Sequence, residues 1–304
     1  MYYCFGKLHI TIKFHYWNHD LFADFRRLAL SVFAVSLIDQ VFWKTNQIIL
    51  GIVQGTGAVA VYSIASLIYM NYMALSTAIS GVYLPHITEL VAKRKPVQEL
   101  SALFTQIGRW QYYLLALVAT GFIIFGKQFI QIWAGAGFTD AYIITLFIIL
   151  PFTIDLIQNI GLAILQAMNC YDFRAKIYFL TGVLNLIIAI PLGTYYGGIG
   201  CAVATGVSML IGNGLIMNIF YARCINLDIK EFWCQIGRIT IAVLICLVIG
   251  YGVDSLLPVS GKLGFVLKIL LYTVLYSVLI YRFAMNTKEQ AKVEKILKKL
   301  ISLG

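Results

Sequence analysis

The chain has 304 residues, of which 61% are hydrophobic and 12% charged, and its mean hydropathy is +0.85. This composition is too apolar for a soluble globular domain and indicates a polytopic membrane protein. Membrane topology and contact with anionic lipid explain the formal net charge of +10, so we expect no nucleic-acid partner.

Membrane-spanning helices are the predicted elements, because the apolar stretches reach the roughly 20 residues that a spanning helix needs. Residues 1–27 mix aromatic and basic side chains and predict a cytoplasmic or interfacial linker, with a disordered start as the alternative. Eight apolar stretches follow, at 28–50, 58–84, 110–133, 141–168, 177–196, 199–222, 235–253 and 263–284. We expect an all-α bundle made of a six-helix transmembrane lobe at 28–222 and two additional helices at 235–284.

Basic residues alternate between the two ends of these predicted helices. Lys44, Lys127, Lys262 and Lys268 are the four exceptions, and the other basic residues, out of 23, lie at every second boundary. By the positive-inside rule, both termini are then cytoplasmic. Residues 285–304 combine lysines with regularly spaced apolar residues and predict a basic amphipathic helix on anionic lipid, with a solvated tail as the alternative.

Charged and amide side chains interrupt the first predicted span. Asp39, Lys44 and Asn46 all lie between positions 39 and 47, although a charge near the bilayer centre costs roughly 2.5–3.5 kcal/mol on insertion scales. Such residues face a bundle interior or a water-filled cavity and often mark a transport pathway. A lock between helices with no transport role is the alternative interpretation.

A second polar stripe is predicted along the fourth span, 141–168. At 100° per residue, one side of a continuous helix would carry Asp155, Gln158, Asn159, Gln166 and Asn169. Pro151 lies one turn before this stripe and predicts a kink or break, because proline cannot donate the helical hydrogen bond. Pro191 is a second candidate, with Asn185 a turn and a half before it, and a kink used only for packing is equally compatible there.

The sequence carries no pattern of enzymatic or metal chemistry. The six cysteines and four histidines show neither disulfide nor metal-ligand spacing, and no P-loop or Ser-His-Asp order is present. A membrane glycosyltransferase or polymerase would require an acidic metal motif or a large outer loop with catalytic residues, and neither is visible. We therefore expect no catalytic residues, metal or cofactor.

A series of motifs between about residues 14 and 235 resembles the polysaccharide-biosynthesis flippases of the multidrug/oligosaccharidyl-lipid/polysaccharide exporter superfamily. In chain order the motifs are Asp39-Gln40, residues 43–51, 58–65 and 75–80, Leu84-Pro85, Gly108-Arg109, residues 125–127 and 133–135, Gln158-Asn159, residues 166–169 and Asn185. Each motif is weak alone, and the series is specific. The resemblance covers the second six-helix lobe and the two extra helices of such a flippase.

The resemblance implies transport of lipid-linked oligosaccharide across the bacterial cytoplasmic membrane. Its implied cargo is undecaprenyl-diphosphate-linked oligosaccharide for surface polysaccharide such as O-antigen or capsule, moved by alternating access between two lobes. We expect a half or N-terminally truncated transporter whose partner is a first lobe or a second copy. A non-transporting remnant and a cation-coupled drug exporter of the same superfamily are the alternatives.

The resemblance also implies roles for the polar residues. Lys44 and Arg109 would attract diphosphate or anionic sugar, and Asp39 or Asp155 would bias opening through ion or proton occupancy. Glycan hydroxyls would exchange hydrogen bonds with the amides of Gln158, Asn159, Gln166 and Asn169. The family often carries an acidic residue where this chain has Asn46, so the resemblance leaves the coupling role of that position open.

Overall fold

The computed structural model describes residues 43–168, 171–256 and 261–301, together with the single positions 22, 26, 29, 30, 33 and 40. The chain forms two compact units, Met1–Trp43 and Lys44–Gly304. The second unit holds nearly all of the described residues. Most of the predicted site residues therefore belong to that unit, whereas Asp39 and Asn169 lie outside the described residues.

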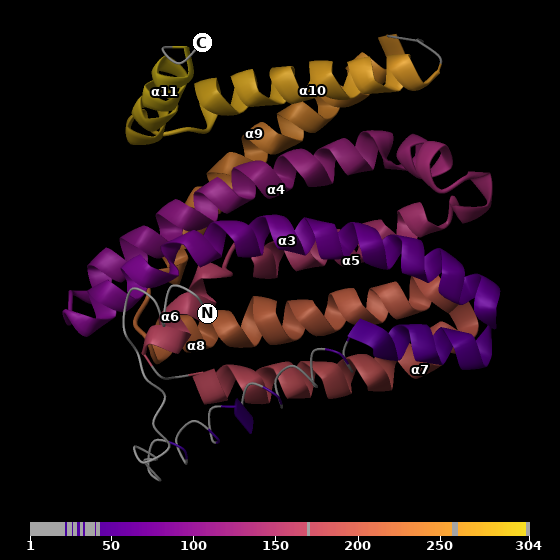
Figure 1. Cartoon of the computed structure of the whole chain (residues 1–304), viewed down its shortest axis with the longest axis horizontal. Helices are drawn as coiled ribbons and strands as arrows, with labels where there is room; N and C mark the ends of the chain where they lie inside the picture. The colour runs from indigo at the N-terminus through magenta and orange to yellow at the C-terminus, as the bar shows by residue number, and fades with distance from the viewer. Residues whose placement is uncertain are drawn as a thin grey trace, which may run out of the picture. The chain divides into compact units, whose positions relative to one another are not determined.

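The second unit is built from helices throughout its described part, as Figure 1 shows. Residues 44–53 are helical and precede the first labelled helix. The labelled helices are α3 (Thr56–Ala92), α4 (Val97–Trp133), η2 (Ala136–Phe138), α5 (Ala141–Leu156), α6 (Ile160–Ala167), α7 (Tyr171–Met209), η3 (Leu210–Ile216), α8 (Met217–Arg223), α9 (Ile229–Leu256), α10 (Lys262–Phe283) and α11 (Thr287–Ile301). Among the described residues there is no strand, and the predicted all-α class is confirmed.

Five described helices are long and apolar enough to cross a membrane, and α5 with α6 forms a sixth span if this pair, bent by 44°, is taken together. The longest of the five, Phe173–Arg223, has 51 residues. It would be about 76 Å long if straight, more than twice the hydrocarbon thickness of a bilayer. Gly197 interrupts it with φ 60° and ψ −137°, so this stretch consists of two spans that meet at the predicted boundary.

Six of the eight predicted spans thus coincide with continuous helical stretches and 141–168 coincides with the bent pair α5 and α6, whereas the first, 28–50, lies largely outside the described residues. Gly197 lies in the turn between the predicted spans 177–196 and 199–222, and its positive φ is allowed because glycine adopts positive φ without a steric penalty. The chain then reverses so tightly that a side chain at Gly200 would overlap the Leu192 carbonyl. The sequence predicted this boundary as the interval between the apolar stretches 177–196 and 199–222.

The helix breaks lie after the prolines that were expected to cause them. Pro151 lies inside α5, and the helix continues to Leu156 before the bend into α6. Proline leaves the carbonyl of the residue four positions earlier, here Phe147, without its helical donor. Gly206 of α7 packs directly against this carbonyl. Pro191 likewise lies inside a continuous helical stretch, and the break comes at Gly197.

Close packing holds α5 at the centre of the second unit. This helix packs against α3, α4 and α7, and its buried side chains include Ile148, Phe152 and Leu156. At the bend, the hydroxyl of Ser76 donates a 2.7 Å hydrogen bond to the Leu156 carbonyl. The bend is therefore satisfied within the protein, as a membrane environment requires of irregular backbone.

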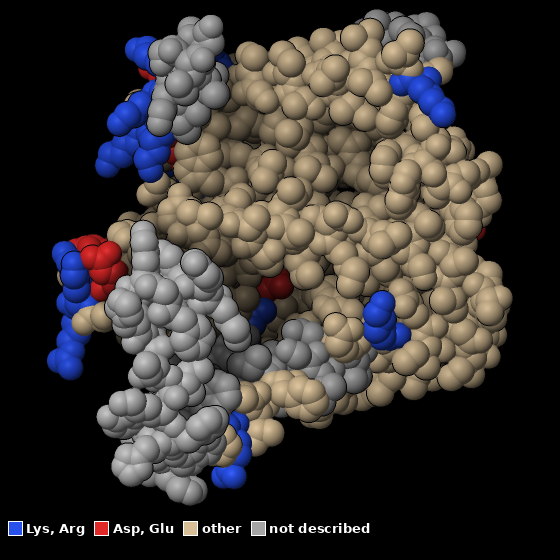
Figure 2. All heavy atoms as spheres, viewed as in Figure 1, with Lys and Arg blue, Asp and Glu red and all other residues tan. Residues whose placement is uncertain are grey.

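Charge is distributed unevenly over the second unit. In Figure 2 most Lys and Arg side chains gather where α11 and the start of α4 lie in Figure 1, while uncharged side chains cover most of the visible sides. We call this end, which also carries the end of α8 and the start of α9, the basic end. The arrangement agrees with basic residues at alternate helix boundaries.

Candidate functional site

A buried polar cluster joins the helix at 44–53 to α3 and to both halves of α7. The amide Nδ2 of Asn46 donates to the Tyr62 hydroxyl at 2.9 Å and to Thr205 Oγ1 at 2.6 Å. Thr205 Oγ1 lies 3.4 Å from Asn185 Oδ1. The structure therefore brings together Asn46 and Asn185, which the sequence identified separately, and adds Tyr62 and Thr205 to them.

Two amide atoms of this cluster have no hydrogen-bond partner among the described residues. They are Asn46 Oδ1 and Asn185 Nδ2, and both are buried. Buried polar atoms without a partner are uncommon and call for a specific explanation, such as a ligand or stored strain. The four side chains of the cluster are neutral, so its chemistry is that of amide and hydroxyl dipoles.

Lys44 lies only two residues from Asn46, but its side chain is exposed. Neighbouring Gln47 is half-buried, and its Nε2 donates to the Ser66 hydroxyl at 3.2 Å. One turn of this helix therefore presents an amide to the bundle interior and a cation to the surroundings. The described polar residues of the predicted interruption at 39–47 are therefore divided between those two environments.

The second predicted stripe meets the bend between α5 and α6. Asp155 is half-buried in the last turn of α5, Gln158 is buried with its Nε2 on the Ile154 carbonyl at 2.8 Å, and Asn159 precedes α6. Gln166 is exposed near the end of α6. Since α6 is bent by 44° from α5, these side chains do not form the single straight stripe that a continuous helix would give.

Asp155 has a neighbourhood that the sequence did not reveal. It lies within electrostatic range of Arg174 from α7 and beside the amide of Asn213, and Tyr221 of α8 shares this environment. Asn213 belongs to η3, a seven-residue π-helix, and π-helical segments occur frequently at functional sites. The carboxylate therefore belongs to a polar cluster formed by three separate parts of the chain.

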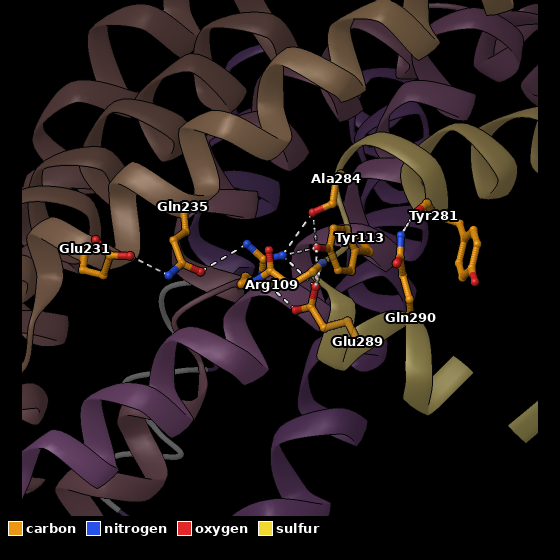
Figure 3. A network of polar contacts seen from close by, with 9 residues as sticks. Arg109, Tyr113, Glu231, Gln235, Tyr281, Ala284, Glu289 and Gln290 are labelled. Carbon is orange, nitrogen blue, oxygen red and sulfur yellow. Dashed lines mark hydrogen bonds and ion pairs between the residues drawn. The ribbon is translucent and has the colours of Figure 1, made fainter. Parts of the chain in front are cut away.

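Arg109 lies at the basic end in the network of Figure 3. Its Nε and Nη2 donate to the two carboxylate oxygens of Glu289 at 2.8 Å and 2.6 Å. Its Nη1 donates to Gln235 Oε1 at 3.1 Å. The Nη2 atom also lies 2.7 Å from the Tyr113 hydroxyl and 3.1 Å from the Ala284 carbonyl. The predicted anion-attracting residue thus already holds a carboxylate of the same chain.

This network joins four helices. Arg109 and Tyr113 come from α4, Gln235 from α9, Ala284 from the end of α10 and Glu289 from α11. A cation at the carboxyl end of α10 also interacts favourably with the helix dipole. The arrangement fixes the start of α11 against the bundle by a charge-assisted, two-bond pair, which is stronger than a hydrogen bond between neutral groups.

Electrostatics keep the Glu289 carboxyl ionised. Burial raises the pKa of this carboxyl, but the hydrogen bonds from Arg109, the Asn286 backbone N–H and Tyr113 outweigh burial and hold the pKa below its usual range. In the sequence, Glu289 was predicted only as part of the basic amphipathic tail at 285–304. A signal was present, since helical spacing places position 289 on the same side as the apolar position 293.

An ion pair joins the two additional helices, α9 and α10, near the connection between them. Lys268 of α10, one of the four basic residues that depart from the alternating pattern, pairs with Asp254 Oδ1 of α9 at 2.7 Å. Its side chain is 10% exposed. The exception therefore has a local partner, which reduces the cost of placing a cation within an apolar helix.

The described residues of the second unit line at least two hollows. One, of about 950 Å³, is mainly apolar and lies between α3, α4 and α10. Another, of about 670 Å³, lies beside Arg109 at the basic end and is lined by polar side chains of α4, α9 and α11. The described residues contain no group of three or more His, Cys, Asp or Glu side chains that could hold a metal ion.

Comparison with known proteins points to flippases. No family model matches the chain. It is similar to the probable low-salt glycan biosynthesis flippase Agl15 of Haloferax volcanii, with 26% identity over 250 residues that cover 79% of this chain and 51% of that protein. It is also similar in fold to the lipid II flippase MurJ in an inward closed conformation, with a TM-score of 0.67 and 19% identity, covering 88% of this chain and 56% of that one.

The chain spans about half the length of these two proteins. The resemblance to polysaccharide-biosynthesis flippases, predicted from the series of motifs, is confirmed by the match to a glycan biosynthesis flippase. The fold likeness to MurJ also places the helices of the second unit in an architecture shared with a known flippase.

Proposed function

We propose that this chain takes part in moving lipid-linked oligosaccharide from one leaflet of a membrane to the other, without chemical conversion of the cargo. The observation that carries this proposal is the match to a glycan biosynthesis flippase over 79% of the chain. Polar groups inside apolar helices support it, because such groups are costly in lipid and are typical of transport pathways.

The cargo that we propose is undecaprenyl-diphosphate-linked oligosaccharide for bacterial surface polysaccharide, O-antigen or capsule. The transporter would lie in the cytoplasmic membrane with both termini in the cytoplasm, where the basic end would contact anionic lipid. A diphosphate carrier fits the guanidinium of Arg109 and the exposed Lys44, since Arg binds phosphate oxygens through its planar fork of donors.

The remaining polar residues would act on the glycan and on the opening equilibrium. Amides at the bend and along α6 offer donors and acceptors to sugar hydroxyls, through Gln158, Asn159 and Gln166, with Asn169 further along the chain. Asp39 and Asp155 are the proposed sites at which a bound ion or proton biases opening. Asn46 and Asn185 would link the helix at 44–53 to α7 during that change.

We propose that a second lobe, supplied by another part of the transporter or by a second copy, completes the transport cleft. The basis is that the chain spans 51% of the flippase that it matches in sequence and 56% of the one that it matches in fold. A transport cleft between two lobes requires both of them, so transport is tested with a complete transporter.

Surface glycan export tests the assignment in cells. Asp39→Asn and Lys44→Ala, each placed in a complete transporter that contains this chain, should reduce the glycan exported to the cell surface. Lys127→Ala is the matched control, because Lys127 is also an exposed cation in an apolar helix. If both variants export as much glycan as the unmodified transporter, the pathway assignment fails, and drug efflux with normal glycan export would identify a drug exporter instead.

A further inference from the structure

The C-terminal helix α11 meets the bundle through an acidic residue. Its described side chains include the exposed Lys288, Lys292, Lys295 and Lys298, yet the buried residue at its start is Glu289. The side chains of Glu289 and Arg109 are 7% and 6% exposed, respectively. A basic helix is thus held against a basic residue by one of its few carboxylates.

The contact has the geometry of anion recognition. Two nitrogens of one guanidinium face two oxygens of one anion at 2.8 Å and 2.6 Å, which is the arrangement that Arg also uses for phosphate. Figure 3 shows both groups pointing toward each other from separate helices. The Glu289 carboxylate therefore occupies the position in which an external oxyanion would bind Arg109.

Space and charge for a larger anion lie beside this pair. The polar pocket of about 670 Å³ is lined by three cations, Arg109, Lys288 and Lys292, and by three anions, Asp228, Glu231 and Glu289. These charges balance while Glu289 is ionised in place, and neutralising Glu289 alone, as in Glu289→Gln, leaves the lining with an excess of one positive charge. Glu231 is engaged by Gln235 Nε2 at 2.6 Å, and the amides of Gln98 and Gln106 also line the pocket.

Few other contacts retain α11. Within the described part of the chain, no helix packs closely along its length, and it stands at the basic end beyond α10 in Figure 1. Besides the Arg109 pair, the Tyr113 hydroxyl donates to Glu289 Oε2 at 3.1 Å, Gln290 Nε2 donates to the Tyr281 carbonyl at 2.8 Å and the Tyr281 hydroxyl donates to Glu294 at 2.8 Å. The last of these bonds is exposed, so it contributes little to holding the helix.

We propose that α11 is an autoinhibitory strap, in which the Glu289 carboxylate occupies Arg109 until a diphosphate group displaces it and binds in the polar pocket. This inference rests on the proposed function for its cargo class. The diphosphate could belong to a lipid headgroup or to a free phosphate compound, and both share the chemistry that Arg109 recognises. The exchange breaks no covalent bond, because one oxyanion replaces another.

Direct binding of inorganic pyrophosphate to the full chain in lipid nanodiscs tests the exchange. Glu289→Gln removes the internal competitor, and we expect at least about tenfold tighter pyrophosphate binding by calorimetry, since a tethered group competes at an effective concentration of roughly millimolar. Glu294→Gln is the matched control on the same helix and should bind as the unmodified chain does. The double variant Arg109→Gln, Glu289→Gln should lose the gain.

A second measurement detects the movement in a chain that keeps Glu289. Spin labels at Lys95→Cys and Lys298→Cys, with the native cysteines replaced by serine, report the distance from the start of the α4 region to α11. Pyrophosphate should shift and broaden that distance distribution. Vesicles that contain a diphosphate lipid should do the same if the headgroup reaches the pocket, and vesicles with the corresponding neutral lipid should not.

The outcomes separate the strap from the proposed function. An unchanged label distance with both pyrophosphate and the diphosphate lipid, or unchanged pyrophosphate affinity in Glu289→Gln, overturns the strap and leaves glycan transport to be judged by export. A label shift with pyrophosphate alone supports the strap with a soluble anion as its ligand. A shift in a transporter that exports no glycan supports the strap and counts against the proposed function.

Discussion

At residue 46, one amide donates to two hydroxyls from helices that lie 16 and 159 residues further along the chain. The sequence could mark Asn46 as a polar residue in an apolar segment, but it could not supply these partners. Neither Tyr62, within the motif at 58–65, nor Thr205 was predicted as a partner of Asn46, because only the packing of the helices brings them together. The contribution of a buried polar residue to stability depends on such partners, because burying an unpaired polar group in lipid is costly in free energy.

Asn46→Ala should lower the thermal stability of the chain. The change removes two buried hydrogen bonds and leaves two hydroxyls without that donor, which costs about 1–3 kcal/mol. The midpoint of thermal unfolding in detergent, followed by fluorescence, measures the loss. Gln131→Ala, which truncates an exposed amide of α4, should leave the midpoint nearly unchanged. Equal midpoints for both variants would show that the Asn46 cluster contributes no stability.

The Arg109–Glu289 pair should resist acidification until the pH falls below the ordinary range of a carboxylate. Because the folded-state pKa of Glu289 is lowered, the pair contributes stability above the unfolded pKa of about 4.3 and loses it as the pH falls through the folded value. The groups facing this carboxylate are Arg109, Tyr113 and the Asn286 backbone N–H.

The distance between the spin labels at Lys298→Cys on α11 and Lys95→Cys beside α4 can follow this titration. We expect a constant label distance from neutral pH down to about pH 5, since the unfolded carboxyl itself titrates near 4.3, and release of α11 only below that. Glu289→Gln should remove the acid transition in the distance. A transition between pH 5 and 8 would contradict the assignment of the pair to this carboxylate, because no histidine contacts Glu289 in the network of Figure 3.

At the scale of elements, the bend between α5 and α6 shows what a sequence pattern leaves undetermined. Pro151 correctly pointed to an irregular span, but the bend comes after Leu156. Its position depends on side chains from elsewhere, since Ser76 of α3 satisfies the Leu156 carbonyl. Such a partner, 80 residues away, cannot be inferred from the local run of residues.

Close approach of α4 to the bend makes Gly108 a sensitive position. An added methyl group there would lie 2.8 Å from the Ile157 carbonyl and 2.5 Å from the ring of Phe232. Gly108→Ala should therefore destabilise the chain by about 1–3 kcal/mol through overpacking. Gly237→Ala is the matched control, because nothing lies within 4 Å of the new methyl group in α9.

The control should change stability in the opposite direction. Alanine in place of an unobstructed helical glycine is favourable by roughly 0.5–1 kcal/mol, so Gly237→Ala should raise the unfolding midpoint while Gly108→Ala lowers it. Reconstituted protein in the same detergent allows a direct comparison. If Gly108→Ala unfolds at or above the midpoint of the unmodified chain, the close approach of α4 to the bend is wrong.

For the whole molecule, hydropathy was sufficient to place seven spans, six of which coincide with continuous helical stretches and one with the bent pair α5 and α6. Contacts between those spans were not accessible from the sequence. Packing in lipid depends on complementary surfaces more than on hydrophobicity, and an apolar helix presents similar residues on every side. Arg109 illustrates the difference, because its sequence context indicated a cation at a helix end but did not identify Glu289, 180 residues away, as its partner.

The distribution of charge makes the orientation of the chain testable. Exposed Cys224 lies at the basic end after α8, whereas exposed Lys262 begins α10 at the opposite end in Figure 1. Positively charged connections remain on the cytoplasmic side. Cys224, as the sole remaining cysteine, should therefore react with a membrane-impermeant maleimide only in inverted vesicles, and Lys262→Cys in a cysteine-free chain only in intact cells. Labelling of Cys224 in intact cells would reverse the orientation and place the α11 strap outside, where a cytoplasmic diphosphate could not reach Arg109.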